Sequence, residues 1–329
     1  MSESAFSNAG KVEKALGELR KLPLLPAAAQ QAMELANNEA SSLHELSRLV
    51  ERDVTLASSI LKLANSPIFS WGRTIDSLEQ AVVRLGLREC QNLMMAVSMG
   101  NLFHQSDPQT KGYCAVLWKH CFLTACLCRR LNKDLRFDYQ GEEFTAGLLH
   151  DLGRILLAVT MPGKFAEADP LDFVEDAHLL ERERSRLHTD HCQLGALYAE
   201  QNRLPASAIA AIRYHHHPAE SKDHRGILGL VAIADDMANQ MQRGENLEGY
   251  DVTTARGYEQ IARGWSPEKA AEFKRIIPKV LKETERLVSE KTASAPSTAT
   301  KRFVPKATNA PKTEASSLSL GSIRSWFGG

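Results

Sequence analysis

The sequence has no net charge of either sign and no long hydrophobic run. Its 329 residues include 40 lysines and arginines and 40 aspartates and glutamates, and only 6% are aromatic. The balanced charge gives no indication of nucleic-acid binding. No apolar stretch approaches the roughly 18–20 residues that span a bilayer, and the polar start MSESAFSNAGK lacks a signal-peptide core. We therefore expect a cytoplasmic protein that does not bind nucleic acid.

The six cysteines are poorly placed for a disulfide framework. Four of them lie within residues 114–128, a segment with a helical apolar pattern. Stabilising disulfides usually join distant parts of a small secreted chain, whereas this chain is long and its cysteines are crowded. The sequence therefore favours reduced thiols in a cytoplasmic protein.

No segment shows the alternating apolar pattern of a β-strand, and no Asn-Gly hairpin signal joins two such segments. Apolar residues instead recur every three or four positions, as in TLASSILKLANS and SLEQAVVRLGLRECQNLMMAVS. This periodicity predicts an all-α fold. We expect an N-terminal extension at 1–19, a first helical lobe at about 20–107, a second lobe at about 111–245 and C-terminal helices at 246–291.

Residues 292–329 differ from the rest of the chain. They carry five basic residues and one acidic residue, are rich in Ser, Thr, Ala and Pro, and lack helical periodicity. This composition predicts a disordered tail. The tail could dock on a partner protein or a membrane, or fold back on the protein's own surface, because its end is apolar: Leu318, Leu320, Ile323, Trp326 and Phe327.

Seven potential metal ligands are spread along the second lobe. Histidine and aspartate supply most sites for borderline and hard divalent metals. His150 and Asp151 lie within the apolar segment AGLLHDLGRILL, where an unpartnered buried charge would cost several kcal/mol. Each residue alone is more simply a surface residue or a hydrogen-bonded core residue. Together they suggest a metal site made of His120, His150, Asp151, His191, His215, His216 and Asp235.

Several segments resemble, in the same order, an HDOD domain (HD-related output domain), a bacterial signalling module of the HD superfamily. They include LPLLPAAAQQAMELANNEASSLHELSRLVERD, SLEQAVVRLGL, LWKHCFLTA, AGLLHDLGRILL, HCQLGALYAEQNRLP and LVAIADDMA. The resemblance covers roughly residues 20–240, with the HDOD domain at 20–220. It implies an HD-like helical bundle with an N-terminal helical lobe. It also implies a regulatory module that binds signalling proteins or a nucleotide second messenger.

The resemblance also implies a role for each ligand. Matched by motif to catalytic members of the superfamily, one divalent ion would be held by His120, His150, Asp151 and Asp235. Asp151 would bridge to a second ion held by His191, His215 and His216. Iron, manganese and zinc all suit such ligands.

Two departures from the superfamily bear on catalysis. HD-GYP phosphodiesterases have a lysine three residues after the motif aspartate, where this chain has Arg154; arginine could contact phosphate but does not readily exchange a proton. The Gly-Tyr-Pro signature after the paired histidines is replaced by HHHPAESKDHRG. These departures favour a non-catalytic signalling module with a metal site. The full ligand set favours the alternative, a metal-dependent phosphohydrolase of nucleotides or cyclic dinucleotides.

Overall fold

The computed structural model describes residues 54–65, 74–102, 108–175 and 177–289, together with Gln31, Glu34, Leu35 and Phe69. Within these residues every regular element is a helix and none is a strand, which confirms the all-α prediction. The predicted extension at 1–19 and the tail at 292–329, including its apolar end at 318–327, lie outside the described residues.

The described part of the first lobe consists of three helices: α4 (Val54–Ala64), α5 (Leu78–Leu85) and α6 (Leu87–Leu102). The hydroxyl of Ser77 accepts a hydrogen bond from the Gln80 amide and caps α5, and Gly86 ends that helix at a φ of +90°. The side-chain amide of Asn65, just after α4, donates to the Ile75 carbonyl and accepts from the Ile75 amide. These bonds tie the end of α4 to the residues that precede α5.

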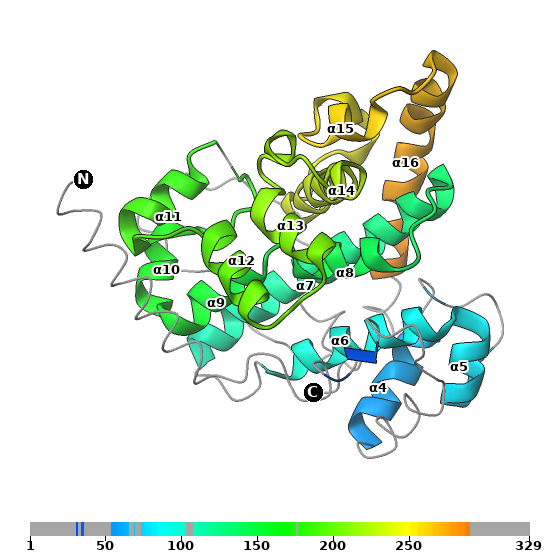
Figure 1. Cartoon of the computed structure of the whole chain (residues 1–329), viewed down its shortest axis with the longest axis horizontal. Coiled ribbons are helices and arrows are strands. Elements are labelled where there is room, and N and C mark those ends of the chain that lie inside the picture. The colour runs from blue at the N-terminus through cyan, green and yellow to red at the C-terminus, as the bar shows by residue number, and fades with distance from the viewer. Residues whose placement is uncertain are drawn as a thin grey trace.

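The second lobe is built around α7 (Pro108–Leu135), a helix of 28 residues. Six shorter helices follow it along the chain: α8 (Glu142–Leu149), α9 (Leu152–Thr160), α10 (Pro162–Ala168), α11 (Leu179–Leu187), α12 (His191–Gln201) and α13 (Ala206–Tyr214). In Figure 1, α7 lies in the middle of the molecule, between the first lobe and the C-terminal helices.

Two hydrophobic cores meet along α7. The first joins the first lobe to α7, α9 and α12 through residues such as Leu93, Leu117 and Leu194, all fully buried. The second joins α7 to the C-terminal part of the chain through residues such as Leu127 and Phe273, also fully buried. Burial on both sides explains why this long helix carries few charges in its central half.

The C-terminal part begins with α14 (Arg225–Arg243), which packs along α7. The short turns η2 (Pro218–Glu220), η3 (Leu247–Gly249) and η4 (Val252–Thr254) precede or follow it, and α15 (Tyr258–Ala262) and α16 (Pro267–Ser289) complete the fold. Pro267 is the first residue of α16, and the Ser266 hydroxyl accepts a hydrogen bond from the Lys269 amide. In the part of the chain that the structure describes, no helix is both long and apolar enough to span a bilayer.

Candidate metal centre

The seven ligand candidates of the second lobe come together in the fold. They come from the middle of α7, the α8–α9 junction, the first residue of α12, the two positions after α13 and the middle of α14: His120, His150, Asp151, His191, His215, His216 and Asp235. Six of the seven are fully buried and His216 is 9% exposed. Residues more than 100 positions apart in the sequence thus form one buried polar cluster.

The junction between α8 and α9 places Asp151 at the centre of this cluster. Asp151 precedes α9, but its φ and ψ of −101° and 19° are not those of a capping residue, and its side chain caps no backbone amide. The carboxylate is therefore available to the surrounding side chains rather than to the end of its own helix.

Close contact between α9 and α12 brings His191 to Asp151. A Cβ atom on Gly153 would lie 1.8 Å from the carbonyl oxygen of His191, and one on Gly195 would lie 2.9 Å from the amide nitrogen of Gly153. Only glycine allows the two backbones to touch in this way. Asp190 caps α12 by accepting a hydrogen bond from the Gln193 amide, so His191 starts the helix in a fixed position.

The first set of ligand candidates is His120, His150 and Asp235 with one oxygen of Asp151. The Nε2 atoms of His120 and His150 lie 3.2 Å apart. Oδ1 of Asp235 lies 3.0 Å from His120 Nε2 and 3.6 Å from His150 Nε2. Oδ2 of Asp151 lies 3.7 Å from both imidazole nitrogens. His120, His150 and Asp235 thus offer ligand atoms that all lie within 4.8 Å of one another.

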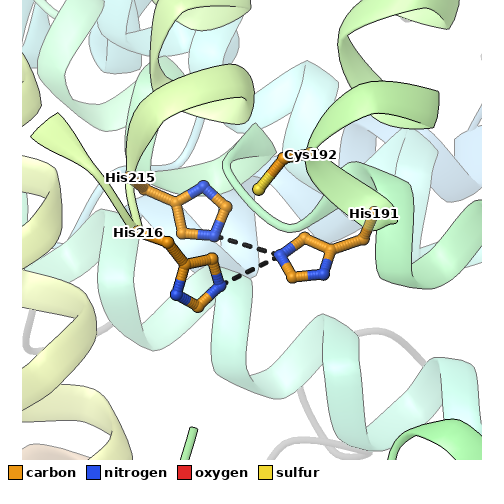
Figure 2. A group of neighbouring side chains, drawn as sticks. All are labelled: His191, Cys192, His215 and His216. Carbon is orange, nitrogen blue, oxygen red and sulfur yellow. Dashed lines mark hydrogen bonds between the residues drawn. The ribbon is translucent and has the colours of Figure 1, made fainter. Parts of the chain in front are cut away.

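The second set is His191 and His215 with the other oxygen of Asp151. The two Nε2 atoms lie 3.3 Å apart, and Oδ1 of Asp151 lies 3.6 Å from His191 and 3.4 Å from His215. Figure 2 shows the rings of His215 and His216 facing His191, with the thiol of Cys192 beside them. Nε2 of His216 lies 3.1 Å from Nε2 of His191.

The outward-facing nitrogens of four histidines determine where their ring protons lie. Each Nδ1 is within hydrogen-bond distance of an oxygen acceptor: Gln242 for His120, the Gly147 carbonyl for His150, Glu183 for His191, and the Ala211 carbonyl for His215. A neutral ring that donates from Nδ1 has its lone pair on Nε2, as metal-binding histidines usually do. These four Nε2 atoms face the centre.

These residues fit a divalent cation. Oδ1 of Asp151 is buried and has no hydrogen-bond partner in the described part of the chain, which is rare for a carboxylate oxygen. Nitrogens bound at about 2.0–2.1 Å to one metal lie roughly 3.0–3.4 Å apart, and the two Nε2 pairs lie 3.2 and 3.3 Å apart. Because the two oxygens of Asp151 face different sets, this carboxylate could bridge two ions.

The surroundings of the cluster contain more negative than positive charge. Five carboxylates with buried side chains, Asp151, Asp169, Glu175, Glu183 and Asp235, lie in or around it. Two guanidiniums, Arg154 and Arg256, contact them. Five negative and two positive charges leave three negative charges before any histidine is protonated. Buried charges of this kind require balance by protons or a cation.

The pKa directions follow from this charge balance. Burial tends to raise the pKa of Asp151, but Arg154 and His150 outweigh it and hold this pKa well below its usual value. The pKa of Asp235 is also well below its usual value, since hydrogen bonds with His120 and His150 outweigh burial. For His216, burial, His215 and Arg256 all lower the pKa well below the usual value. Both carboxylates are therefore ionised and His216 is neutral.

Most of the sequence that forms this cluster matches the model of a known protein family. The model of the HDOD domain matches residues 22–218, more than half of the chain. The chain belongs to the HDOD family. The matched part contains six of the seven ligand candidates, while Asp235 and Arg256 of this HDOD protein follow it.

Two solved structures share the fold of this chain, and a curated relative shares part of its sequence. An HDOD domain protein of unknown function from Geobacter sulfurreducens matches with a TM-score of 0.66 and 22% identity, over 85% of this chain and 98% of its own. A protein from Shewanella amazonensis SB2B, named as a proposed phosphohydrolase, matches with a TM-score of 0.60 and 23% identity, over 83% and 97%. The TM-scores of these two matches show a shared fold.

The curated relative is an uncharacterised protein of Treponema pallidum (strain Nichols). It is 27% identical over 218 residues, which are 65% of this chain and 41% of that protein. This HDOD protein therefore spans about two fifths of the length of its relative.

The structure gives Arg154 a different environment from the one expected of a phosphate-contacting residue. Its side chain is 1% exposed. It donates to both oxygens of Asp169, to Oδ2 of Asp151 and to Oε1 of Glu175, at 2.8–3.1 Å. Because carboxylates surround its guanidinium, Arg154 balances charge within the protein and holds Asp151 in place.

Sequence reasoning did not identify several residues around the centre. Glu175, Glu183, Cys192, Gln242 and Arg256 all contact or adjoin the ligand candidates. Glu183 lies in the charged segment ERERSR and Arg256 in a turn, where such residues usually face solvent. Of these residues, only Cys192 could have been suggested by the sequence, because it directly follows the ligand candidate His191.

His150 should make the stability of the metal-free protein depend on pH. Burial lowers its pKa, but Asp151 and Asp235 outweigh this and raise it to about 9. The folded-state pKa lies above the unfolded value of about 6.5, so the stabilisation is complete below pH ~6.5 and is lost as pH rises to ~9. Since one pH unit corresponds to about 1.4 kcal/mol, the loss should reach about 3 kcal/mol.

Urea unfolding in the presence of a chelator at several pH values measures this effect. His150→Gln should flatten the decline between pH ~6.5 and ~9. His178→Gln, whose ring lies 73% exposed on the surface, should leave it unchanged. An equally steep decline in the His150 variant would contradict the assignment.

Proposed function

We propose that this chain is a signalling module that binds a protein partner or a nucleotide and carries a buried divalent-metal centre that does not turn over substrate. The observation that best supports this proposal is that the centre is closed off from solvent. Six of the seven ligand candidates have no exposed surface. Arg154, itself buried, and the partly exposed Arg256 contact the carboxylates. A catalytic metal needs an open coordination position that water or substrate can reach.

A structural or regulatory ion is compatible with such a closed centre. It would supply the positive charge that the surplus of carboxylates requires and would tie α7, α9, α12 and α14 to one point. The ligands would be neutral imidazoles and carboxylates, a set that suits iron, manganese or zinc. The regulatory role agrees with the membership of the HDOD family.

The second candidate function is a metal-dependent phosphohydrolase. One observation favours it: the two oxygens of Asp151 face two different sets of histidines. Enzymes that hydrolyse phosphoesters with two metal ions use such a bridging carboxylate. A second solved protein from Shewanella amazonensis SB2B, which has the same fold, is named as a proposed metal-dependent phosphohydrolase.

Metal analysis combined with an activity panel separates the two. The purified full chain is measured for bound iron, manganese and zinc, and incubated with mononucleotides, cyclic dinucleotides and p-nitrophenyl phosphate esters. We expect bound metal that Asp151→Ala removes, and no phosphate release above the level of that variant. Asp138→Ala, which changes an exposed carboxylate, should keep the metal.

Phosphate release by the wild type that Asp151→Ala abolishes would establish the hydrolase instead. Failure of the wild-type chain to hold any of the three metals, as isolated or after reconstitution, would contradict the metal centre in both functions.

A further inference from the structure

Arg256 contacts the metal centre from a part of the chain that follows the matched HDOD domain. It lies between η4 and α15. Its Nη1 donates to Nδ1 of His216 at 2.6 Å. Its Nη2 donates to Oδ2 of Asp235 at 2.8 Å and to Oε2 of Glu175 at 3.1 Å. The side chain is 28% exposed, while its carboxylate partners are at most 4% exposed. Arg256 therefore lies at the outer edge of the centre.

The backbone next to Arg256 is fixed against α14. A Cβ atom on Gly257 would lie 2.1 Å from the carbonyl oxygen of Gly229, and one on Gly229 would lie 2.8 Å from the carbonyl oxygen of Gly257. The two glycines thus allow direct backbone contact. Gly229 lies six residues before Asp235 in α14, so its contact with Gly257 holds the turn that carries Arg256 near Asp235. The position of the guanidinium therefore follows from the packing of the fold.

The contact with Arg256 distinguishes His216 from the other four histidines. A guanidinium can only donate hydrogen bonds, so Nδ1 of His216 must accept. A neutral imidazole has one ring proton, which must then lie on Nε2. That Nε2 faces His191 Nε2 at 3.1 Å and has no lone pair for a metal. The hydrogen bond from Arg256 and metal binding through Nε2 of His216 therefore exclude each other.

We propose that Arg256 takes the place of a second cation and limits the centre to one metal ion. With Arg256 in contact, His216 is withheld from the second set, which keeps His191, His215, Oδ1 of Asp151 and the neighbouring thiol of Cys192. The guanidinium also places a positive charge next to the second set, which opposes a further cation. When Arg256 is removed, the His216 proton can move to Nδ1 and its Nε2 can bind a second ion. This inference rests on the metal centre of the proposed function.

Manganese titration of the full chain tests the number of ions. The protein is freed of metal with a chelator, titrated with Mn²⁺, desalted and examined by EPR. Wild type should hold about one Mn²⁺ with the spectrum of an isolated ion, and Arg256→Met about two with the spectrum of a coupled pair. Arg263→Met, an exposed arginine on the same segment, should behave as wild type. Adding His216→Ala to Arg256→Met should return the count to about one.

A second measurement needs no metal. Histidine-labelled protein examined by ¹⁵N NMR reports which ring nitrogen carries the proton, and the His216 signals are assigned by their loss in His216→Gln. We expect the Nε2–H form in wild type and the Nδ1–H form in Arg256→Met. The Nδ1–H form in wild type would overturn the inference whatever the metal content.

The outcomes separate this inference from the function on which it rests. One ion in both wild type and Arg256→Met, or two in wild type, would overturn the role of Arg256 and leave the metal centre standing. No bound ion in either protein would overturn the metal centre, and with it the competition between Arg256 and a second ion.

Discussion

Arg154→Met should cause one of the largest losses of stability that a single substitution can produce in this protein. The change removes the guanidinium that contacts Asp151, Asp169 and Glu175. The three carboxylates would remain buried without their main cationic partner. Breaking a buried charge network by removing one partner costs about 3–5 kcal/mol. The free energy of unfolding, measured with urea at neutral pH, gives this loss.

Two control variants test whether the loss of stability in Arg154→Met comes from the broken charge network. Arg213→Met removes an arginine whose ion pair with Glu200 is partly exposed, at 36% and 47% of the two side chains, and should cost at most about 1 kcal/mol. Arg154→Lys keeps the positive charge but cannot reproduce the bidentate contact with Asp169, so its stability should lie between those of wild type and Arg154→Met. If Arg154→Met were no more destabilising than Arg213→Met, the charge-balancing role of Arg154 would be wrong.

Gly153→Ala should be comparably damaging for a steric reason. The added Cβ would lie 1.8 Å from the carbonyl oxygen and 2.6 Å from the carbonyl carbon of His191. These are backbone atoms, so α9 and α12 must move apart, which separates Asp151 from His191. Overpacking of this kind costs about 3 kcal/mol or more where the backbone cannot yield. Urea unfolding measures the loss, and a lower metal content of the variant should accompany it.

Gly163→Ala is the matched control for this substitution. Gly163 lies in α10, and a Cβ atom added there would meet no atom within 4 Å. Replacing an unstrained helical glycine by alanine stabilises by about 0.5–1 kcal/mol. Equal stability of the two variants would show that the contact between α9 and α12 is looser than described.

The sequence allowed the fold and the members of the central cluster to be predicted for two different reasons. The helices follow from apolar periodicity, which α5 and α14 show clearly, whereas α7 is buried along a continuous stretch. The seven ligand candidates were selected by residue type and by resemblance, and the fold brings all seven together. Their role as metal ligands remains a prediction, because proximity permits coordination without demonstrating it.

The surroundings of the centre could not be predicted in the same way. The role of Arg154 depends on Asp169 and Glu175, which lie 15 and 21 positions away and reach it only through the path of the chain after α10. Arg256 reaches His216 across 40 positions. No local pattern encodes such contacts, since they arise from how helices pack rather than from propensity. Charged residues in turns are usually solvated, so nothing in the sequence around Arg256 marks it as part of the centre.

The long separations within the centre also determine when it can form during synthesis. His120 hydrogen-bonds to Gln242, 122 positions later, and Asp235 and Arg256 likewise follow most of the chain. A nascent chain emerges from its N-terminus, so the first half of α14, as far as Asp235, must leave the ribosome before the first set of ligand candidates is complete. Closing loops of this length is also entropically demanding and slows folding. A product truncated at residue 218 would accordingly keep six of the seven ligand candidates but lack Asp235, so its first set would be incomplete.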